Sequence, residues 1–411
     1  MTQKISKKKM LGESYTTNYL KIRRATILFS TVLFALYPYR ITLNSIIHIP
    51  YDTIILSNYI LLPIFLFVIF VCTYRRISIM KASLEIFFSC ILLFVFIGIS
   101  IVWSPKISYS FQKYTYIIFQ LPVLVSFVTF VISNNRQNIR AFIFATLCGS
   151  YILMLALLWG SIFSNGIHTI INEGTYIGVN RLLGVGIVCS IFVIMDVKNN
   201  TLRILFGFFS LMNLFFMTQT GGRGPLIAVI ISLIFSLVWN YNTGKVRDYL
   251  WYMITLFVSL IILVLNGGRT INRLLSLIHD PGRSAIIRID MAIHSVNLFL
   301  ERPLLGHGIG SFPTLYKSGT YMYPHNIFLE ILVESGTIGI IFLSFFIYYV
   351  SITVIKYRNH NYRLAGLISS LIIYSLINAS VSFDIPGNKV FFIYSAMVLA
   401  LFGYDSSNGS V

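Results

Sequence analysis

A histidine–asparagine pair stands directly before a long apolar run. Pro324 precedes His325 and Asn326, and the apolar run begins at residue 327. Because the residue before a proline prefers extended backbone, Tyr323 should lead the chain extended into the run. A neutral imidazole can accept a proton from a hydroxyl nucleophile, and Asn326 could orient the molecule that carries the hydroxyl. The pair predicts base chemistry at one end of a helix; the alternative is a histidine that serves only as a hydrogen-bonded polar residue.

Two carboxylates follow the histidine inside the apolar run. Glu330 and Glu334 lie five and nine residues after His325, near one face of a helix. A carboxylate in such a run is costly unless it is paired or faces a wet cavity. We therefore expect Glu330 and Glu334 to be substrate contacts, and their presence favours a functional histidine.

An arginine flanked by glycines opens another apolar run. In "TQTGGRGPLIAVI", Arg223 follows two glycines and precedes Gly224 and Pro225. The glycines would let the backbone approach a ligand, and the N–H groups of the following helix would point at the same place. This pattern predicts an anion site. The alternative is an interfacial anchor whose guanidinium extends to the lipid headgroups.

Two further arginines lie in the segment "GRSAIIRIDMAIHSVNLFLERP". Its apolar residues have nearly helical spacing, which predicts an amphipathic helix on the outer membrane surface that Pro303 ends. Arg283 and Arg288 would diverge by roughly 140° on that helix, so one of them faces solvent or lipid phosphate. Arg288 could also pair with Asp290. Because the arginine fork suits bidentate phosphate binding, a clamp of Arg223 and Arg288 fits a diphosphate better than a sugar hydroxyl.

The remaining candidates carry less chemistry. Arg181 stands at the outer entry to a predicted span and is a candidate substrate contact, whereas His307 and Asp384 are expected to be structural. The four cysteines lie in apolar segments without CxxC spacing, and we expect no metal site. No Walker loop, dinucleotide fingerprint, GxSxG elbow or HExxH motif occurs, so no nucleotide or metal cofactor is predicted.

The elements that must position these residues are membrane spans. Of 411 residues, 56% are hydrophobic and 11% are charged, and the mean hydropathy is +0.80, which is typical of an all-α polytopic membrane protein. The formal net charge of +18 is divided among short clusters rather than one basic face, which argues against a nucleic-acid partner. About twelve runs are long enough to cross a bilayer; they lie at 25–43, 54–73, 83–103, 114–132, 140–163, 183–197, 203–219, 224–241, 248–266, 327–354, 363–381 and 388–404.

Lysine and arginine positions predict the orientation of these spans. The clusters around Lys7, Arg75, Arg136, Lys198 and Lys245 alternate with poorer loops, which predicts that both termini are cytoplasmic. The predicted order is a basic cytoplasmic tail (1–24), nine spans (25–266), one large periplasmic loop (267–325), three spans (326–404) and a short cytoplasmic tail (405–411). No internal repeat is evident, which disfavours a transporter built from repeats.

These motifs together resemble a known family. His325-Asn326, nine residues, Gly336, two residues and Gly339 resemble the carboxy-terminal signature of the bacterial O-antigen ligase and O-antigen polymerase superfamily. The stretch "TQTGGRGPLIA" is similar to the family's arginine-containing span start, and the segment from Gly282 to Phe312, with its Pro-Leu-Leu-Gly run, resembles the family's periplasmic loop. The resemblance in motifs covers about 218–345.

The resemblance implies a membrane glycosyltransferase of the GT-C type in the bacterial inner membrane, with its active site facing the periplasm. Its donor would be an undecaprenyl-diphosphate-linked oligosaccharide, and its acceptor a glycolipid. By this resemblance His325 is the candidate base, Arg223 and Arg288 bind the diphosphate, and Arg283 occupies a common family position. No nucleotide sugar, metal or other cofactor is implied.

The resemblance leaves the acceptor open. Polymerization onto another lipid-linked repeat unit is the favoured prediction, because many divergent polymerases of this family have this size, and a chain-length regulator is then a candidate partner. Ligation of the glycan to lipid A-core is the alternative. A polysaccharide-lipid flippase belongs to a different class, and it predicts charges spread through the middle of the membrane rather than gathered under one long loop.

Overall fold

The computed structural model describes residues 81–132, 136–163, 176–240, 282–316, 321–359 and 361–401, with isolated positions between 31 and 39 and between 250 and 275. Within these ranges the chain forms helices and turns, without a strand. The predicted span at 54–73 and both predicted cytoplasmic tails lie outside the described residues, and the predicted spans at 25–43 and 248–266 lie outside them except for those isolated positions. The predicted periplasmic loop is described in part, over 282–316 and from 321 onward.

Six helical segments among the described residues are long and apolar enough to cross a membrane. They comprise α4 (Lys81–Ile99) with η2 (Ser100–Trp103), α6 (Arg136–Phe163), α7 (Tyr176–Asp196), α8 (Asn200–Thr220), α14 (Ile327–Tyr357) and α15 (Tyr362–Ala379). Shorter apolar helices are α9 (Arg223–Asn240) and the segment of η6 (Pro386–Asn388), α16 (Lys389–Ala396) and η7 (Met397–Leu401). The helix α5 (Ile107–Phe127) continues into η3 (Val128–Ile132) where a span was predicted at 114–132.

The two short spans predicted at 183–197 and 203–219 are in fact two separate helices of 21 residues each. Asn199 caps α8, because its side chain accepts a hydrogen bond from the Thr201 N–H at 2.8 Å. Gly221, at φ 92°, ends α8 in the left-handed conformation. The predicted start at 183 was wrong because the apolar run was judged to begin after Arg181, whereas α7 begins earlier and buries that arginine.

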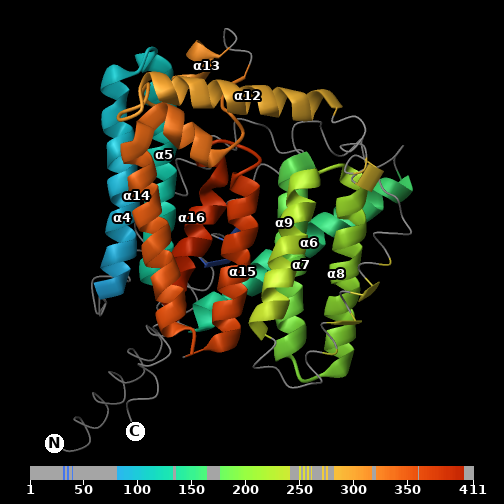
Figure 1. Cartoon of the computed structure of the whole chain (residues 1–411). Helices are drawn as coiled ribbons and strands as arrows, with labels where there is room; N and C mark the ends of the chain where they lie inside the picture. Colours follow the sequence, from blue (N-terminus) through green and yellow to red (C-terminus); the bar gives the residue numbers. More distant parts are fainter. Residues whose placement is uncertain are drawn as a thin grey trace, which may run out of the picture.

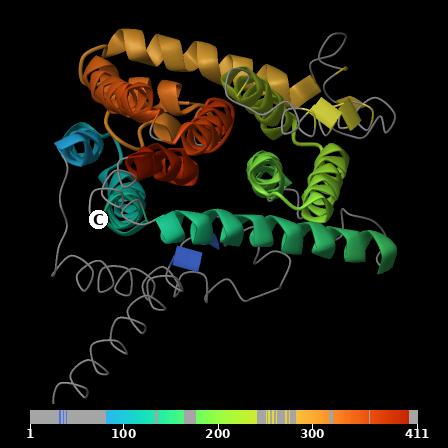
Figure 2. The ribbon, with the colours of Figure 1, turned by 90° about the horizontal axis from the view of Figure 1, so that it is seen from below.

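The helices stand side by side, and one helix crosses an end of the bundle. In Figure 1, α12 (Gly282–Glu301) lies across the upper end, and Figure 2 shows it running along one side of the bundle next to α14 and α9. The predicted amphipathic helix is therefore present. Met291 and Leu298 form a small buried cluster under α12 with Phe312, Tyr316 and Val333. The opposite face of α12 carries exposed Ile286, Ile289 and Ile293.

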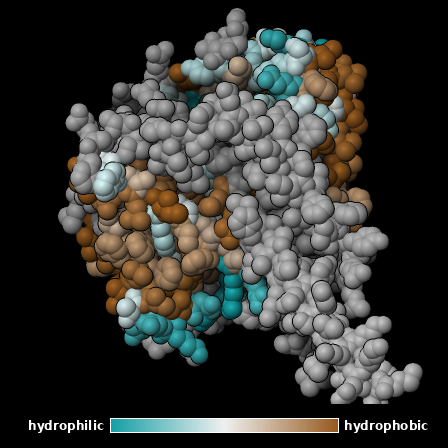
Figure 3. Space-filling view, turned by 180° about the vertical axis from the view of Figure 1, so that it is seen from behind, coloured by the Kyte–Doolittle hydropathy of each residue, from teal (hydrophilic) through white to brown (hydrophobic). Residues whose placement is uncertain are grey.

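The outer surface of the bundle is apolar over much of its height. Phe144, Trp159, Phe208 and Val238 each expose more than half of their surface. Figure 3 shows hydrophobic residues over the middle of the visible described surface, with hydrophilic residues toward its ends. Contiguous exposed apolar surface of this kind is unfavourable in water and favourable against lipid. The chain is an all-α polytopic membrane protein.

The helix α14 is broken at Gly336, between its second and third turns, and a loop fills the break. Gly336 has φ 63° and ψ −159°, which interrupts the helical hydrogen bonds. The loop of residues 303–308 replaces these bonds. His307 N–H donates to the Val333 carbonyl at 2.8 Å, and Gly308 N–H donates to that of Glu334 at 3.0 Å. In return, Thr337 N–H donates to the Pro303 carbonyl at 2.8 Å. The Pro-Leu-Leu-Gly run (303–306) and Gly336 therefore contact each other. We call this contact between the 303–308 loop and the break in α14 the joint.

Candidate active site

His325 is held in a strained conformation at the start of α14. Its φ is 58°, in a region that residues other than glycine rarely occupy. Asn326 caps α14, because its Oδ1 accepts hydrogen bonds from the N–H groups of Phe328 at 2.9 Å and Leu329 at 3.2 Å. The Tyr323 ring packs edge-on against the imidazole, with centroids 4.7 Å apart. The cap and the ring together fix the position of the histidine.

The surroundings of His325 favour a neutral imidazole. Burial, and secondly the positive charge of Arg288, lower the pKa of His325 to about 4. Its Nδ1 is buried without a hydrogen-bond partner. Burial, followed by the negative charge of Asp384, raises the pKa of Tyr323 to about 12. At neutral pH the site therefore offers an uncharged imidazole able to accept a proton beside a protonated phenol.

Arg223 and Arg288 lie at the same recess although they are 65 residues apart in the chain. Arg223 is the first residue of α9, and Arg288 comes from α12. The recess is also lined by Tyr176, Ile177, Gly221, Gly222, Gly224, Pro225, Ser284 and Ser382. Arg288 additionally donates from Nη1 to the Val381 carbonyl at 2.7 Å. Two arginines, three residues that carry a hydroxyl (Tyr176, Ser284 and Ser382) and a helix N-terminus at one recess form a geometry suited to a phosphate-bearing ligand.

The other predicted arginines take different places. The backbone of Arg283 lies in the first turn of α12, and its side chain is outside the described part of the structure. Arg181 is buried and donates to Asn388 Oδ1 at 3.0 Å and to the carbonyls of Asn378 at 2.7 Å and Ser382 at 3.1 Å. Arg181 thus anchors the turn after α15 and is not placed to touch a ligand in the recess.

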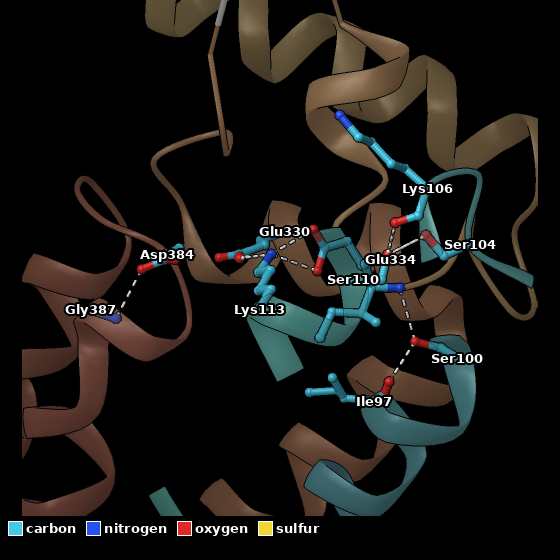
Figure 4. A network of polar contacts seen from close by, with 11 residues as sticks. Ile97, Ser100, Ser104, Lys106, Ser110, Lys113, Glu330, Glu334, Asp384 and Gly387 are labelled. Carbon is cyan, nitrogen blue, oxygen red and sulfur yellow. Dashed lines mark hydrogen bonds and ion pairs between the residues drawn. The ribbon is translucent and has the colours of Figure 1, made fainter. Parts of the chain in front are cut away.

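Glu330 and Glu334 are engaged in a buried ion pair. Lys113 of α5 donates from Nζ to Glu330 Oε1 at 2.6 Å and to the Glu334 carboxylate oxygens at 2.6 and 2.8 Å, and all three residues are buried (Figure 4). Neither carboxylate lines the recess of Arg223 and Arg288. We interpret them as positioning groups rather than as the expected substrate contacts, because they tie the first two turns of α14 to α5.

Lys113 was not predicted as a site residue from the sequence. The available signal was a single lysine surrounded by aromatic and apolar residues in "YSFQKYTYIIF". Asp384 was expected to be structural. Its Oδ1 accepts a hydrogen bond from the Gly387 N–H at 2.9 Å, and Figure 4 shows Asp384 beside Glu330 and Lys113.

Serine side chains fix the loop that enters the break in α14. Ser104 and Ser110 donate to the Ile309 carbonyl at 2.9 and 2.6 Å, and the Ile309 N–H donates to Ser100 Oγ at 3.0 Å. Figure 4 shows these serines next to the Lys113 network. His307 interacts through Nε2 with the Leu298 carbonyl at 2.8 Å. This contact links the loop to α12, in agreement with the structural role expected of His307. The site is therefore supported by contacts from η2 and the turn after it, from α5, from α12 and from α14.

The comparison with known proteins matches the region that contains these features. Residues 206–344 match the family model described as O-antigen ligase. The matched region includes Arg223, Arg288, His325, Asn326 and the broken part of α14. No curated protein matches the chain. The superfamily predicted from the motifs is confirmed for this region.

Proposed function

We propose that this chain, whose residues 206–344 belong to the O-antigen ligase family, is a membrane glycosyltransferase that uses a lipid-diphosphate-linked glycan. The family supports an enzyme that acts on lipid-linked glycans in the membrane but does not separate ligase from polymerase. The observation that carries the proposal is the shared recess of Arg223 and Arg288 with a neutral histidine in the electrostatic range of Arg288.

The proposed reaction is a single displacement. The oxygen of an acceptor hydroxyl attacks the anomeric carbon of the donor glycan, and the bond from that carbon to the diphosphate oxygen breaks. His325 accepts the hydroxyl proton as the new glycosidic bond forms. Arg223 and Arg288 stabilise the negative charge that develops on the departing lipid diphosphate. One displacement inverts the configuration at the anomeric carbon.

We propose a periplasmic polymerase that extends an undecaprenyl-diphosphate-linked glycan onto a lipid-linked repeat unit. A ligase that transfers the glycan to lipid A-core would use the same residues. The gathering of His325, Arg223, Arg288 and the Lys113 network at the α12 end of the bundle supports transfer rather than transport, because a flippase needs charges through the middle of the membrane.

Glycan profiles of a deletion strain test the proposal. We expect the strain to carry lipopolysaccharide cores with one repeat unit, and the wild-type gene to restore long chains. Bare cores with accumulated lipid-linked polymer would instead identify a ligase. An unchanged profile would contradict both activities.

A variant of His325 tests the base in the same strain. His325→Asn should fail to restore the glycan, because asparagine tolerates the left-handed conformation but cannot act as a base at neutral pH. The variant should be inserted in the membrane in normal amount, as measured by immunoblot. Full restoration by this variant would contradict the role of His325.

A further inference from the structure

A crevice lies at the end of the bundle opposite the recess of Arg223 and Arg288. It is formed by α6, α7, α8 and the start of α15. The helix α15 runs from this crevice to the turn that Arg288 contacts, and its 18 residues span about 27 Å. The crevice is therefore separated from the candidate active site by nearly the thickness of a bilayer's hydrocarbon core.

The lining of the crevice changes from polar to apolar along the helices. Arg140 lies in the first turns of α6, Asp196 ends α7, and Arg363 lies in the first turn of α15. Phe144 and Leu147, one to two turns further along α6, line the apolar part. The crevice thus has a charged mouth and an apolar interior. This arrangement matches a phospholipid, which has a charged headgroup and apolar acyl chains.

Aromatic residues place the charged mouth at the level of the membrane–water interface. Trp239 donates from Nε1 to the Tyr362 carbonyl at 3.2 Å, and the Tyr362 hydroxyl donates to the Trp239 carbonyl at 2.6 Å. Tryptophan and tyrosine concentrate at the headgroup level of membrane proteins. Because Tyr362 directly precedes Arg363, the arginine that lines the mouth lies at the height of lipid phosphates.

The charges of the mouth favour an anionic headgroup. Arg363 lies 3.6 Å from Asp196 through Nη1, and both side chains are substantially exposed, at 40% and 68%. Arg363 Nη1 also donates to the Met195 carbonyl at 3.1 Å. Because the exposed pair with Asp196 is weak and a guanidinium carries five N–H donors, a phosphate can bind to Arg363 in addition to these partners. Arg140 adds a second positive charge, so the charged residues of the described lining, Arg140, Asp196 and Arg363, have a formal net charge of +1. Basic pockets between transmembrane helices are known binding places for anionic lipid headgroups.

We propose that this crevice binds an anionic phospholipid, with its phosphate at Arg140 and Arg363 and one acyl chain along Phe144 and Leu147. The bound lipid would join α6 to α15 and would stabilise the folded bundle by mass action. The site depends neither on the recess nor on glycan transfer, so it can be tested apart from the proposed function.

Lipid titrations of the delipidated full-length protein in detergent test the site. We expect dioleoylphosphatidylglycerol to raise the melting temperature, and dioleoylphosphatidylcholine or inorganic phosphate to leave it unchanged. In native mass spectrometry, Arg140→Gln combined with Arg363→Gln should weaken phosphatidylglycerol binding about 30-fold, from about 1 kcal/mol per arginine. Arg358→Gln is the matched control, because Arg358 is exposed at the same end but does not line the crevice.

Several results would overturn the proposal. An equal stabilisation by phosphatidylcholine would indicate a nonspecific effect of added lipid, and stabilisation by inorganic phosphate alone would indicate a small-anion site. Equal weakening by Arg358→Gln would indicate general surface charge. If the double variant is too unstable to purify, Arg140→Lys and Arg363→Lys should retain binding, and loss of binding in these charge-preserving variants would contradict a headgroup site.

Discussion

His325 has the features of a proton acceptor held in a prepared position. A left-handed conformation costs a residue with a side chain about 1–3 kcal/mol and persists only where the surroundings enforce it. Here the Asn326 cap and the Tyr323 ring enforce it. In the proposed reaction Asn326 would act by positioning His325, because its Oδ1 already accepts hydrogen bonds from the first N–H groups of α14.

The pH dependence of transfer should report the environment of His325. Because burial and the Arg288 charge both disfavour the imidazolium, its pKa is lowered to about 4. We therefore expect kcat/KM to stay level as the pH falls through 6.5 and to drop only near pH 4. Arg288→Gln removes the nearby charge and should move the low-pH limb upward, in addition to weakening donor binding. A wild-type limb at the ordinary histidine pKa would contradict this assignment.

Arg223 should require its guanidinium and not only its charge. Arg223→Lys replaces a planar fork with a single ammonium group, so we expect roughly a 10- to 100-fold loss in kcat/KM, from about 1.5–3 kcal/mol for a lost charge-assisted contact. Ser284→Ala is the comparison variant, because it removes a neutral group from the same recess. Wild-type transfer rates for Arg223→Lys would indicate a headgroup anchor instead of a diphosphate clamp.

At the scale of elements, the joint between α14 and the loop of residues 303–308 holds the site together. A Cβ atom on Gly336 would lie 2.4 Å from the Leu304 carbonyl oxygen, and one on Gly306 would lie 2.7 Å from the Gly336 nitrogen. Both glycines also have positive φ. The family signature therefore has a mechanical basis, because the two backbones can meet only where neither residue has a side chain.

Gly336→Ala should disrupt this joint. We expect a clear fall in melting temperature and loss of glycan transfer, because both the contact and the backbone conformation exclude a side chain. Thr337→Val removes only an exposed hydrogen bond of 2.8 Å from the Thr337 hydroxyl to the Pro303 carbonyl. It should therefore lower the stability only slightly. Thermal unfolding of both variants in the same detergent measures the difference. Equal stabilities would contradict the account of the joint.

Variants of Lys113, Glu330 and Glu334 can distinguish a positioning role of these buried charges from a direct role in the reaction. Lys113→Met leaves two buried carboxylates without their cation, and removing one partner of a buried ion pair typically costs about 3–5 kcal/mol. Combining it with Glu330→Gln and Glu334→Gln removes the unpaired charges, so we expect the triple variant to recover much of the lost stability. Recovered transfer in the triple variant would support a positioning role. A stable but inactive triple variant would show that one of these charges takes part in the reaction.

At the scale of the whole molecule, composition and periodicity predicted the class of fold and most of the described helices. The predicted boundary of α7 failed at Arg181, because hydropathy treats a charged residue as the end of a span, whereas the carbonyls of the turn after α15 satisfy this guanidinium. The Lys113 network was not predictable from spacing, because its partners lie more than 200 residues apart in the chain. That Arg223 and Arg288 belong to one site could be predicted from the sequence only because both are arginines suited to binding phosphate.

The orientation of the molecule in the membrane is the remaining prediction at this scale. The positive-inside rule places the α12 end outside and the turn between α7 and α8 in the cytoplasm. Asn297 is exposed on α12, and Asn200 is exposed at the start of α8, so a cysteine at either position should leave the fold intact. A membrane-impermeant maleimide should label Asn297→Cys in spheroplasts, and should label Asn200→Cys only after lysis. The reverse pattern would place His325 in the cytoplasm, where a periplasmic glycan polymerase could not work.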